Sequence, residues 1–229
     1  MSKFKLIIFD IDDVLYSEID YVKSGFLFIA KSISNDIQIQ EKLFSTQMEL
    51  FKKDQKHVFD NLFKIDSLNS ILNVYKKEDL IKLYREHLPS IKLSSKMLSL
   101  LNKIKTKNLF LSILSDGRKK SQELKIKSLG LDKIVEKIIL TDSLGSQMEF
   151  WKPHTYGFKL LLDHFNIESN QSCYIGDNLV KDFVAPNKLG MTSILFKNKN
   201  GLYNLENQNT SQCEFIVNSV SELENLIFK

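Results

Sequence analysis

A short apolar run near the start of the chain ends in three carboxylates, and no other feature constrains the fold as strongly. Residues 5–9 read KLIIF, which is typical of a strand buried on both faces of a parallel sheet. Asp10, Asp12 and Asp13 follow directly. In open α/β sheets, ligands bind beyond the carboxyl ends of the strands, so we expect a site here. Because successive side chains of an extended chain point to opposite faces, we expect Asp10 and Asp12 to converge and Asp13 to diverge.

Closely spaced carboxylates need compensation. Two of them repel each other, so that either one is protonated or a cation lies between them. A simpler interpretation is open at this point: Asp10 is a turn residue, and Asp12 and Asp13 are solvated loop acids. The run by itself does not choose between a cation site and a solvated turn.

The composition is that of an ordinary globular protein. With 229 residues, the chain allows one large domain or one domain with an insertion. Hydrophobic residues make up 43% and charged residues 26%, and 16 phenylalanines favour a large packed core over disorder. The net charge of +4 comes from lysines scattered singly or in pairs, so we predict solvated helix faces and no nucleic-acid partner.

Cysteine usage and apolar runs bear on the location of the protein. Cys173 and Cys213 are too few and too far apart for a disulfide framework or a zinc site. The N-terminus lacks the apolar stretch and cleavage site of a signal peptide, and no run of 18 apolar residues predicts a membrane span. We therefore expect a cytoplasmic protein without a membrane partner.

The chain has two regions with different sequence patterns. Residues 17–91 are helical in pattern, with apolar residues at spacings of three and four that indicate core packing. From about residue 92, apolar strands alternate with helices, which predicts an α/β fold with a doubly wound, mostly parallel sheet. We expect strands at 109–114, 135–140, 173–175 and 192–196, the last being the last clear parallel strand, and helices at 97–104, 120–129, 182–189 and from Lys152 and Pro153 onward. A polar surface loop is expected at 197–212, before a short run at 215–217 and a final helix from Ser221.

Three of the apolar strands end in polar groups, in the segments LIIFDID, LFLSILSDG and SCYIGD. If these strands are parallel neighbours, their ends meet in one cleft. The residues gathered there would be Asp10, Asp12, Ser115, Asp177 and Asp182, with Lys152 at the rim.

Such a set can carry out phosphoryl transfer. A carboxylate can attack phosphorus and form an aspartyl-phosphate. Mg²⁺, a hard cation that takes oxygen ligands, would offset the repulsion between the acids and an anionic substrate. The Ser115 hydroxyl, the backbone N–H groups at Asp116 and Gly117, and the Lys152 ammonium can stabilise charge on the phosphoryl oxygens. A second carboxyl two residues from the nucleophile can give the departing oxygen its proton.

Each of these residues also has an ordinary structural interpretation. Ser115 alone fits a helix N-cap, Lys152 alone an exposed side chain, and Asp177 with Asp182 a turn and cap pair. The four histidines lack metal-ligand spacing to one another. What favours a site is the joint occurrence of these groups, each at the end of a predicted strand or the start of a predicted helix.

These residues resemble the four motifs of the haloacid dehalogenase-like (HAD) superfamily, and the match spans nearly the whole chain. The segments are DIDDV, ILSDG, WKPH and GDNLVKD. The resemblance implies Asp10 as nucleophile, Asp12 as acid/base, Ser115 as phosphate ligand and Lys152 as the cation beside both. It further implies that Asp10, Asp177, Asp182 and the backbone carbonyl of Asp12 serve the metal. Val14 departs from the commoner Thr, a variation that the family tolerates.

The resemblance implies a Rossmann-like core over 1–16 and 92–229 and an inserted helical cap over 17–91 that covers the substrate. Dehalogenases of this superfamily act on carbon without a metal and lack the second acid, so Asp12 favours phosphoryl transfer. A phosphonate hydrolase would need a cap lysine that forms a Schiff base. The candidates are Lys23, Lys31, Lys52 and Lys53.

We therefore predict a Mg²⁺-dependent phosphomonoester hydrolase that acts on a small phosphorylated metabolite through an aspartyl-phosphate. Family analogy suggests a sugar phosphate or a nucleotide. The alternatives are a phosphomutase on the same core and a phospho-accepting signalling module without turnover. The sequence does not indicate the oligomeric state. Lesser candidates for substrate contact or for ordinary packing are Tyr16, Glu18, Tyr21, Arg85, His87 and Arg118.

Overall fold

A computed structural model describes residues 3–202 and 212–229. The chain divides into two compact units, one formed by residues 1–19 with 92–229 and the other by residues 20–91. The first unit contains the sheet, and the second consists of helices. The substrate-covering role expected for residues 17–91 stays a prediction.

The first unit is built on a six-stranded sheet in the order β3-β2-β1-β4-β5-β6, in which every neighbouring pair is parallel. The predicted α/β fold is thereby confirmed. The first strand in sequence lies near the centre, so the residues that follow it are flanked by strand ends on both sides. The strands are β1 (Leu6–Phe9), β2 (Phe110–Ser115), β3 (Lys137–Leu140), β4 (Ser172–Gly176), β5 (Thr192–Phe196) and β6 (Phe215–Val217).

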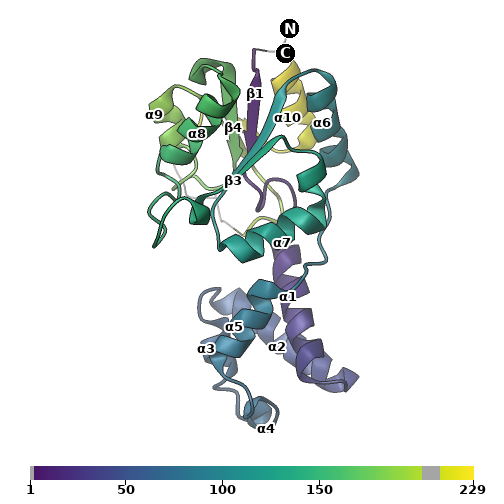
Figure 1. Ribbon diagram of the computed structural model, residues 1–229. Coiled ribbons are helices and arrows are strands. Elements are labelled where there is room, and N and C mark those ends of the chain that lie inside the picture. The colour runs from purple at the N-terminus through teal and green to yellow at the C-terminus, as the bar shows by residue number, and fades with distance from the viewer. Residues whose placement is uncertain (1–2, 203–211) are drawn as a thin grey trace. The chain divides into compact units, whose positions relative to one another are not determined.

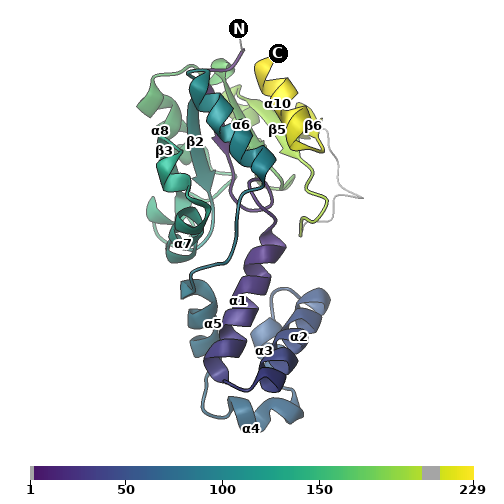
Figure 2. The ribbon, with the colours of Figure 1, turned by 90° about the vertical axis from the view of Figure 1, so that its right-hand side faces the viewer.

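Helices cover both faces of this sheet, as Figures 1 and 2 show. Two of them, α6 (Ser95–Thr106) and α10 (Val220–Phe228), pack together on one face. The opposite face carries α8 (Tyr156–Phe165) and α9 (Val184–Leu189). Helix α7 (Lys119–Leu129) follows β2 and ends at Gly130, whose φ of 67° is the left-handed conformation expected of a C-cap glycine. Short 3₁₀ turns add to the elements, among them η1 (Asp66–Leu68), η2 (Leu131–Lys133), η3 (Thr141–Ser143) and η4 (Ser169–Gln171).

Strands buried on both faces explain the apolar runs in the sequence. All four residues of β1 are buried, and so are all five of β4 and of β5. Between β1, β4 and α8 lies a core that contains Leu6, Ile8, Phe158 and Tyr174, and the rings of the last two meet edge to face at 4.9 Å. This packing fixes the strands whose ends carry the predicted site.

Two of the predicted helix starts are wrong. Lys152 and Pro153 do not open a helix, because α8 begins at Tyr156. The backbone N–H of Lys152 instead donates to Asp116, and the peptide bond between Lys152 and Pro153 is cis. Helix α9 begins at Val184 and not at residue 182, which puts Pro186 in the first turn, where its missing N–H costs no helical hydrogen bond.

Two strand predictions also need correction. Strand β3 starts at Lys137 and not at residue 135, because Val135 N–H bonds back to the carbonyl of Leu131 in η2. Strand β6 pairs in parallel with β5, so residues 192–196 are not the last parallel strand. The polar loop predicted over 197–212 lies mostly outside the described residues, which lack 203–211.

The second unit has its own apolar core. Its helices are α1 (Glu18–Ile33, which begins in the first unit), α2 (Ile37–Lys53), α3 (Val58–Leu62), α4 (Asn69–Leu72) and α5 (Lys77–Glu86). Ile29, Leu43, Leu62 and Leu80 are fully buried at its centre. Helix α2 begins where the Asp36 carboxylate accepts two backbone N–H groups, as an N-cap should. In the described part of the chain, no helix combines the length and the hydropathy needed to cross a bilayer.

Candidate active site

The register of three neighbouring strands brings the predicted residues to one edge of the sheet. Phe9 pairs with Ile113 of β2 on one side and with Ile175 of β4 on the other. Ser115 and Asp177 each come two residues after these partners, and Asp10 follows Phe9. Asp10 N–H donates to the carbonyl of Ile175, which keeps β1 and β4 joined up to this point. The carboxyl ends of β1, β2 and β4 therefore form a common edge, as expected for a parallel sheet.

A buried lysine links the carboxylates at this edge. Lys152 Nζ lies 2.6 Å from Asp10 Oδ2 and 2.9 Å from Asp182 Oδ1. It also donates to the hydroxyl of Tyr174 at 2.7 Å. The Lys152 side chain is 0% exposed, so the ordinary interpretation of this residue as a solvated surface lysine does not apply. Burial alone would lower the pKa of Lys152, but Asp10 and Asp182 raise it well above its usual value.

Ser115 completes the surroundings of Asp10. Its hydroxyl donates to Asp10 Oδ1 at 2.8 Å, while Lys152 binds the other oxygen. The N-cap of α7 is Arg118, so the alternative interpretation of Ser115 as a helix cap also does not apply. Both oxygens of Asp10 therefore face donors that a bound phosphoryl group could share.

Three carboxylates form a group suited to a metal ion. One oxygen from each of Asp10, Asp177 and Asp182 lies within 4.8 Å of the others, and all three residues are buried. Burial raises the pKa of Asp177 to about 9, and the charges of Asp182 and Asp10 add to this effect. Burial also raises the pKa of Asp10, against the charge of Lys152. Three buried carboxylates repel one another when all are ionised, and a hard cation bound between their oxygens offsets that repulsion. The set therefore fits Mg²⁺.

The backbone after β4 holds Asp182 in place. Asp182 Oδ2 accepts the N–H groups of Asp177 and Asn178, at 3.1 and 2.9 Å. Oδ2 of Asp182 thus accepts backbone N–H groups, as a turn or cap residue does, whereas Oδ1 faces Lys152. Gly176 permits this close approach, because a Cβ at that position would lie 2.5 Å from Asp182 Oδ2.

The side chain of Asp116 binds groups that the sequence did not indicate. Its side chain is an acceptor for Thr141 Oγ1 at 2.8 Å, Lys152 N at 3.1 Å and Lys181 Nζ at 3.1 Å. Asp116 therefore braces the loop that carries Lys152. The next residue, Gly117, has a φ of 123°, which L side chains rarely adopt. Phosphate binding by the backbone N–H groups of Asp116 and Gly117 stays a prediction.

Asp12 binds partners that are distinct from those of Asp10. Both of its oxygens accept from Lys125 Nζ, at 2.7 and 2.8 Å. Tyr16 OH donates to Oδ1 at 2.5 Å, and Gln122 Nε2 donates to Oδ2 at 2.9 Å. Burial raises the pKa of Asp12, but the charge and hydrogen bond of Lys125 outweigh it and hold the pKa below its usual value.

Asp13 has partners distinct from those of Asp10 and Asp12. Its φ of 54° is left-handed, and its carboxylate accepts backbone N–H groups from Glu18 and Leu202 at 2.8 and 2.7 Å. Asn198 Nδ2 donates to the Asp13 carbonyl oxygen at 3.2 Å. Asp13 thus ties the segment after β5 to the start of α1.

Several residues at this edge were missed by sequence reasoning. Lys125 and Gln122 belong to a helix predicted correctly, but nothing in their spacing distinguishes them from solvated helix residues. Tyr174 stands in a strand, where a core position is the ordinary expectation. The further missed residues are Thr141, which binds Asp116, and Lys181, which lies inside the segment GDNLVKD. The position of Lys181 inside this motif segment is a sequence feature that could have identified it.

The lesser candidates have structural partners. Arg118 forms an ion pair with Asp142 at 3.5 Å and is about half exposed. His87 is buried in the second unit, where Nδ1 lies 2.7 Å from the Tyr84 carbonyl oxygen and the ring centre lies 5.0 Å from that of Tyr21, with the ring planes tilted by 42°. Tyr16 binds a member of the predicted site, because its hydroxyl donates to Asp12.

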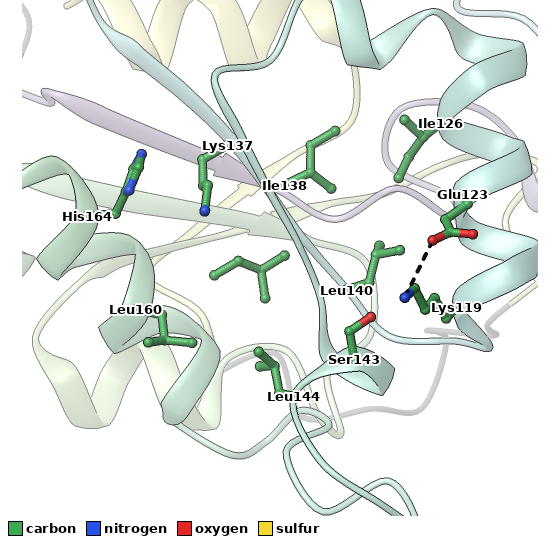
Figure 3. A pocket seen from close by; sticks show the side chains of 11 residues that line it. Lys119, Glu123, Ile126, Lys137, Ile138, Leu140, Ser143, Leu144, Leu160 and His164 are labelled. Atoms are coloured by element: carbon green, nitrogen blue, oxygen red, sulfur yellow. Dashed lines mark ion pairs between the residues drawn. The ribbon is translucent and has the colours of Figure 1, made fainter.

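A separate cavity of about 540 Å³ lies beside the edge strand β3 (Figure 3). Apolar side chains such as Ile126, Leu140 and Leu160 line it, and the ion pair of Lys119 with Glu123 lies at its rim. None of its lining residues belongs to the acidic cluster.

Comparison with known proteins gives consistent results. The family model of haloacid dehalogenase-like hydrolases matches residues 7–196. Glyceraldehyde 3-phosphate phosphatase of Methanocaldococcus jannaschii is 25% identical over 97% of this chain and 96% of its own length. The Pyrococcus abyssi protein of the same name is 28% identical over 84% of this chain and 81% of its own length. The crystal structure of a HAD phosphatase from Thermococcus onnurineus superposes with a TM-score of 0.62, at 18% identity and over 97% of both chains.

Proposed function

The chain belongs to the haloacid dehalogenase-like hydrolases, and from this membership and the geometry of the cluster we propose that it is a phosphomonoester hydrolase. The observation that carries the proposal is the pair of donors on Asp10. Lys152 Nζ and Ser115 Oγ bind its two oxygens at 2.6 and 2.8 Å, and both donors suit a phosphoryl group as well.

In the first step, Asp10 attacks phosphorus. A bond forms between the carboxylate oxygen and phosphorus, and the bond from phosphorus to the leaving oxygen breaks. Asp12 is ionised in the free protein, because Lys125 holds its pKa below the usual value, so it first takes up a proton from solvent and then gives it to the leaving oxygen, which departs as an alcohol. Lys152 and Ser115, which bind the Asp10 oxygens, would stabilise the charge that accumulates on the phosphoryl oxygens.

In the second step, water releases the phosphate. Asp12, now ionised, takes a proton from water as the water oxygen attacks phosphorus. The bond between phosphorus and the Asp10 oxygen breaks, so Asp10 regains its carboxylate and inorganic phosphate leaves. Asp10 is then a carboxylate again, and Asp12 keeps the proton for the next leaving oxygen or returns it to solvent.

Mg²⁺ is the cofactor that we propose for this reaction. Asp10, Asp177 and Asp182 would hold it, with the backbone carbonyl of Asp12 as a further oxygen ligand that the family resemblance suggests. When bound, Mg²⁺ neutralises charge on the phosphoryl oxygens and offsets the repulsion between substrate and acids. The raised pKa of Asp177, about 9, supports the need for a cation among these carboxylates.

The substrate that we propose is a small phosphorylated metabolite of the sugar phosphate class. Two relatives that span most of this chain are named glyceraldehyde 3-phosphate phosphatases, so glyceraldehyde 3-phosphate is the first candidate. We propose the helical unit over residues 20–91 as the cap that shapes the leaving-group pocket. Both cysteines are free thiols, in agreement with the cytoplasmic setting that we propose.

Release of inorganic phosphate tests this function. We expect Mg²⁺-dependent turnover of 4-nitrophenyl phosphate and, more efficiently, of glyceraldehyde 3-phosphate, and loss of both activities in EDTA. Asp10→Asn should lower turnover by at least about 10³-fold, because the amide is a poor nucleophile. The exposed Asp132→Asn is the matched control. Full turnover by Asp10→Asn, or no phosphate release from either ester, would exclude the proposal.

A further inference from the structure

The cavity beside β3 is a part of the sheet-containing unit that the proposed reaction does not use. Strand β3, at the edge of the sheet, contributes all four of its residues, while α7 borders the cavity on one side and α8 on the other (Figure 3). The volume of about 540 Å³ falls within the range of about 300–1,000 Å³ in which proteins bind small organic molecules. The cavity is therefore large enough for a ligand of its own.

Most of the lining is apolar. Six of the 11 lining residues are isoleucine or leucine, and they come from α7, from β3 and from the segment that leads into and through α8. Three of them, Ile138, Leu140 and Leu160, are only partly buried. An apolar molecule that displaces water from such side chains is bound favourably. The main part of a matching ligand should therefore be hydrocarbon or aromatic.

The charges that line the cavity leave one cation uncompensated. Lys119 and Glu123 form an ion pair at 3.9 Å and offset each other. Lys137 has no carboxylate at ion-pair distance within residues 3–202 and 212–229. The adjacent acid, Glu136, accepts the backbone N–H of Leu111 in β2 at 2.9 Å. A single negative charge on the ligand would therefore complement the cavity.

The position of this cation suits a ligand with its charge at one end. In Figure 3, Lys137 and His164 lie on the α8 side of the cavity, and the ion pair of Lys119 with Glu123 lies on the α7 side. An ammonium binds a carboxylate or sulfonate through charge-assisted hydrogen bonds, and an imidazole can donate one more. An acid group bound by Lys137 would leave the rest of the ligand over the apolar side chains between the two sides.

We propose that this cavity binds an organic monoanion with an apolar body, whose acid group meets Lys137 and whose body packs on the isoleucine and leucine side chains. The cavity shares no residue with the acidic cluster of Asp10, Asp177 and Asp182. A sugar phosphate has no apolar body, so this site does not suit the proposed substrate. The inference concerns binding alone and does not depend on the proposed hydrolase activity.

Two fluorescent probes of nearly equal shape separate the charge from the apolar body. Anilinonaphthalene sulfonate carries one negative charge, and phenylnaphthylamine has the same rings without the sulfonate. We expect the wild-type protein to bind both. Lys137→Met should raise the Kd of the sulfonate about 10-fold, because a charge-assisted hydrogen bond is lost, and should leave the Kd of the neutral probe within about twofold. The matched control is Lys133→Met, an exposed residue of η2 outside the cavity, which should keep both Kd values.

A second variant keeps the test decisive if Lys137→Met does not fold. Ser143 lines the cavity and is exposed, so Ser143→Glu adds a negative charge without removing a core side chain. This variant should raise the Kd of the sulfonate about threefold through repulsion between like charges, with little change for the neutral probe.

Three results would overturn the inference: wild-type affinity for the sulfonate in the folded variants, equal losses for both probes, or no binding of either probe by the wild-type protein. Displacement of the sulfonate by Mg²⁺ with inorganic phosphate would also overturn it, because the probe would then occupy the acidic cluster. Phosphate release is not measured in this experiment, so its outcome is distinguishable from a failure of the proposed function.

Discussion

The replacement of Lys152 by Met tests the electrostatic basis of the site. The lysine is 0% exposed, and its partners Asp10 and Asp182 are 5% and 0% exposed. Removal of the ammonium leaves both carboxylates buried without their cation. Breaking one buried ion pair typically costs 3–5 kcal/mol, because the remaining charge has no compensation, so we expect a loss of about 3–5 kcal/mol in the free energy of unfolding. That loss is a large fraction of the about 5–15 kcal/mol by which domains are stable.

Thermal and urea unfolding measure this loss. For a protein of this size, each kcal/mol lowers Tm by roughly 2–4 °C, so Lys152→Met should lower Tm by about 6–20 °C. The matched control is Lys159→Met, an exposed position in α8, for which we expect a change within about 0.5 kcal/mol. The double variant Lys152→Met/Asp182→Asn should regain part of the loss, because one of the two stranded charges is then absent.

The result that would refute this reasoning is a loss below about 1 kcal/mol for Lys152→Met in the absence of metal. It would mean that the buried acids do not depend on the lysine for compensation. A double variant less stable than Lys152→Met alone would also contradict this reasoning, because the uncompensated charge of Asp182 would then not be a cause of the lost stability.

Two further predictions concern Glu18 and Gly176. Burial, with the charges of Asp12 and Asp13, raises the pKa of Glu18 from 4.5 to about 8. Between these two pH values, the folded state keeps a proton on Glu18 that the unfolded state has lost. The free energy of unfolding therefore falls as the pH rises from 4.5 to about 8. Relative to wild type, Glu18→Gln should therefore become more stable by roughly 1–2 kcal/mol when the pH is raised from about 5 to about 9, after allowance for the partial exposure of Glu18. Urea unfolding at the two pH values measures this change. The same stability difference between variant and wild type at both pH values would contradict the prediction. Gly176→Ala would place a Cβ 2.5 Å from Asp182 Oδ2, and Asp182 cannot retreat because the N–H groups of Asp177 and Asn178 hold it. We expect calorimetric Mg²⁺ affinity to fall by about 10–100-fold, and wild-type affinity would show that Asp182 is not part of the metal group.

The sequence was sufficient where local pattern and chain order decide the structure. Apolar runs such as residues 5–9 are needed in a strand buried on both faces, and their alternation with helices allows few topologies other than a parallel sheet. Since ligands bind at the carboxyl ends of such strands, the polar residues after each run could be assigned to one edge. The positions of Asp10, Ser115 and Asp177 at adjacent strand ends follow from this rule.

The sequence was insufficient where a side chain's role depends on a partner distant in the chain. Alternation predicts that Asp10 and Asp12 converge, but it does not indicate which cations they bind, and β1 ends at Phe9. The two acids bind different lysines, Lys152 from the loop before α8 and Lys125 from α7. No local pattern marks Lys125 among the lysines of its helix, because burial is set by the packing of α7.

The short-range order of residues thus determined the sheet, its direction and the acids that end its central strands. Tertiary packing alone decided which cation compensates which acid, since a buried charge takes the partner that lies within reach, whatever its distance in sequence. Lys152 lies 142 residues from Asp10, and Lys125 lies 113 residues from Asp12.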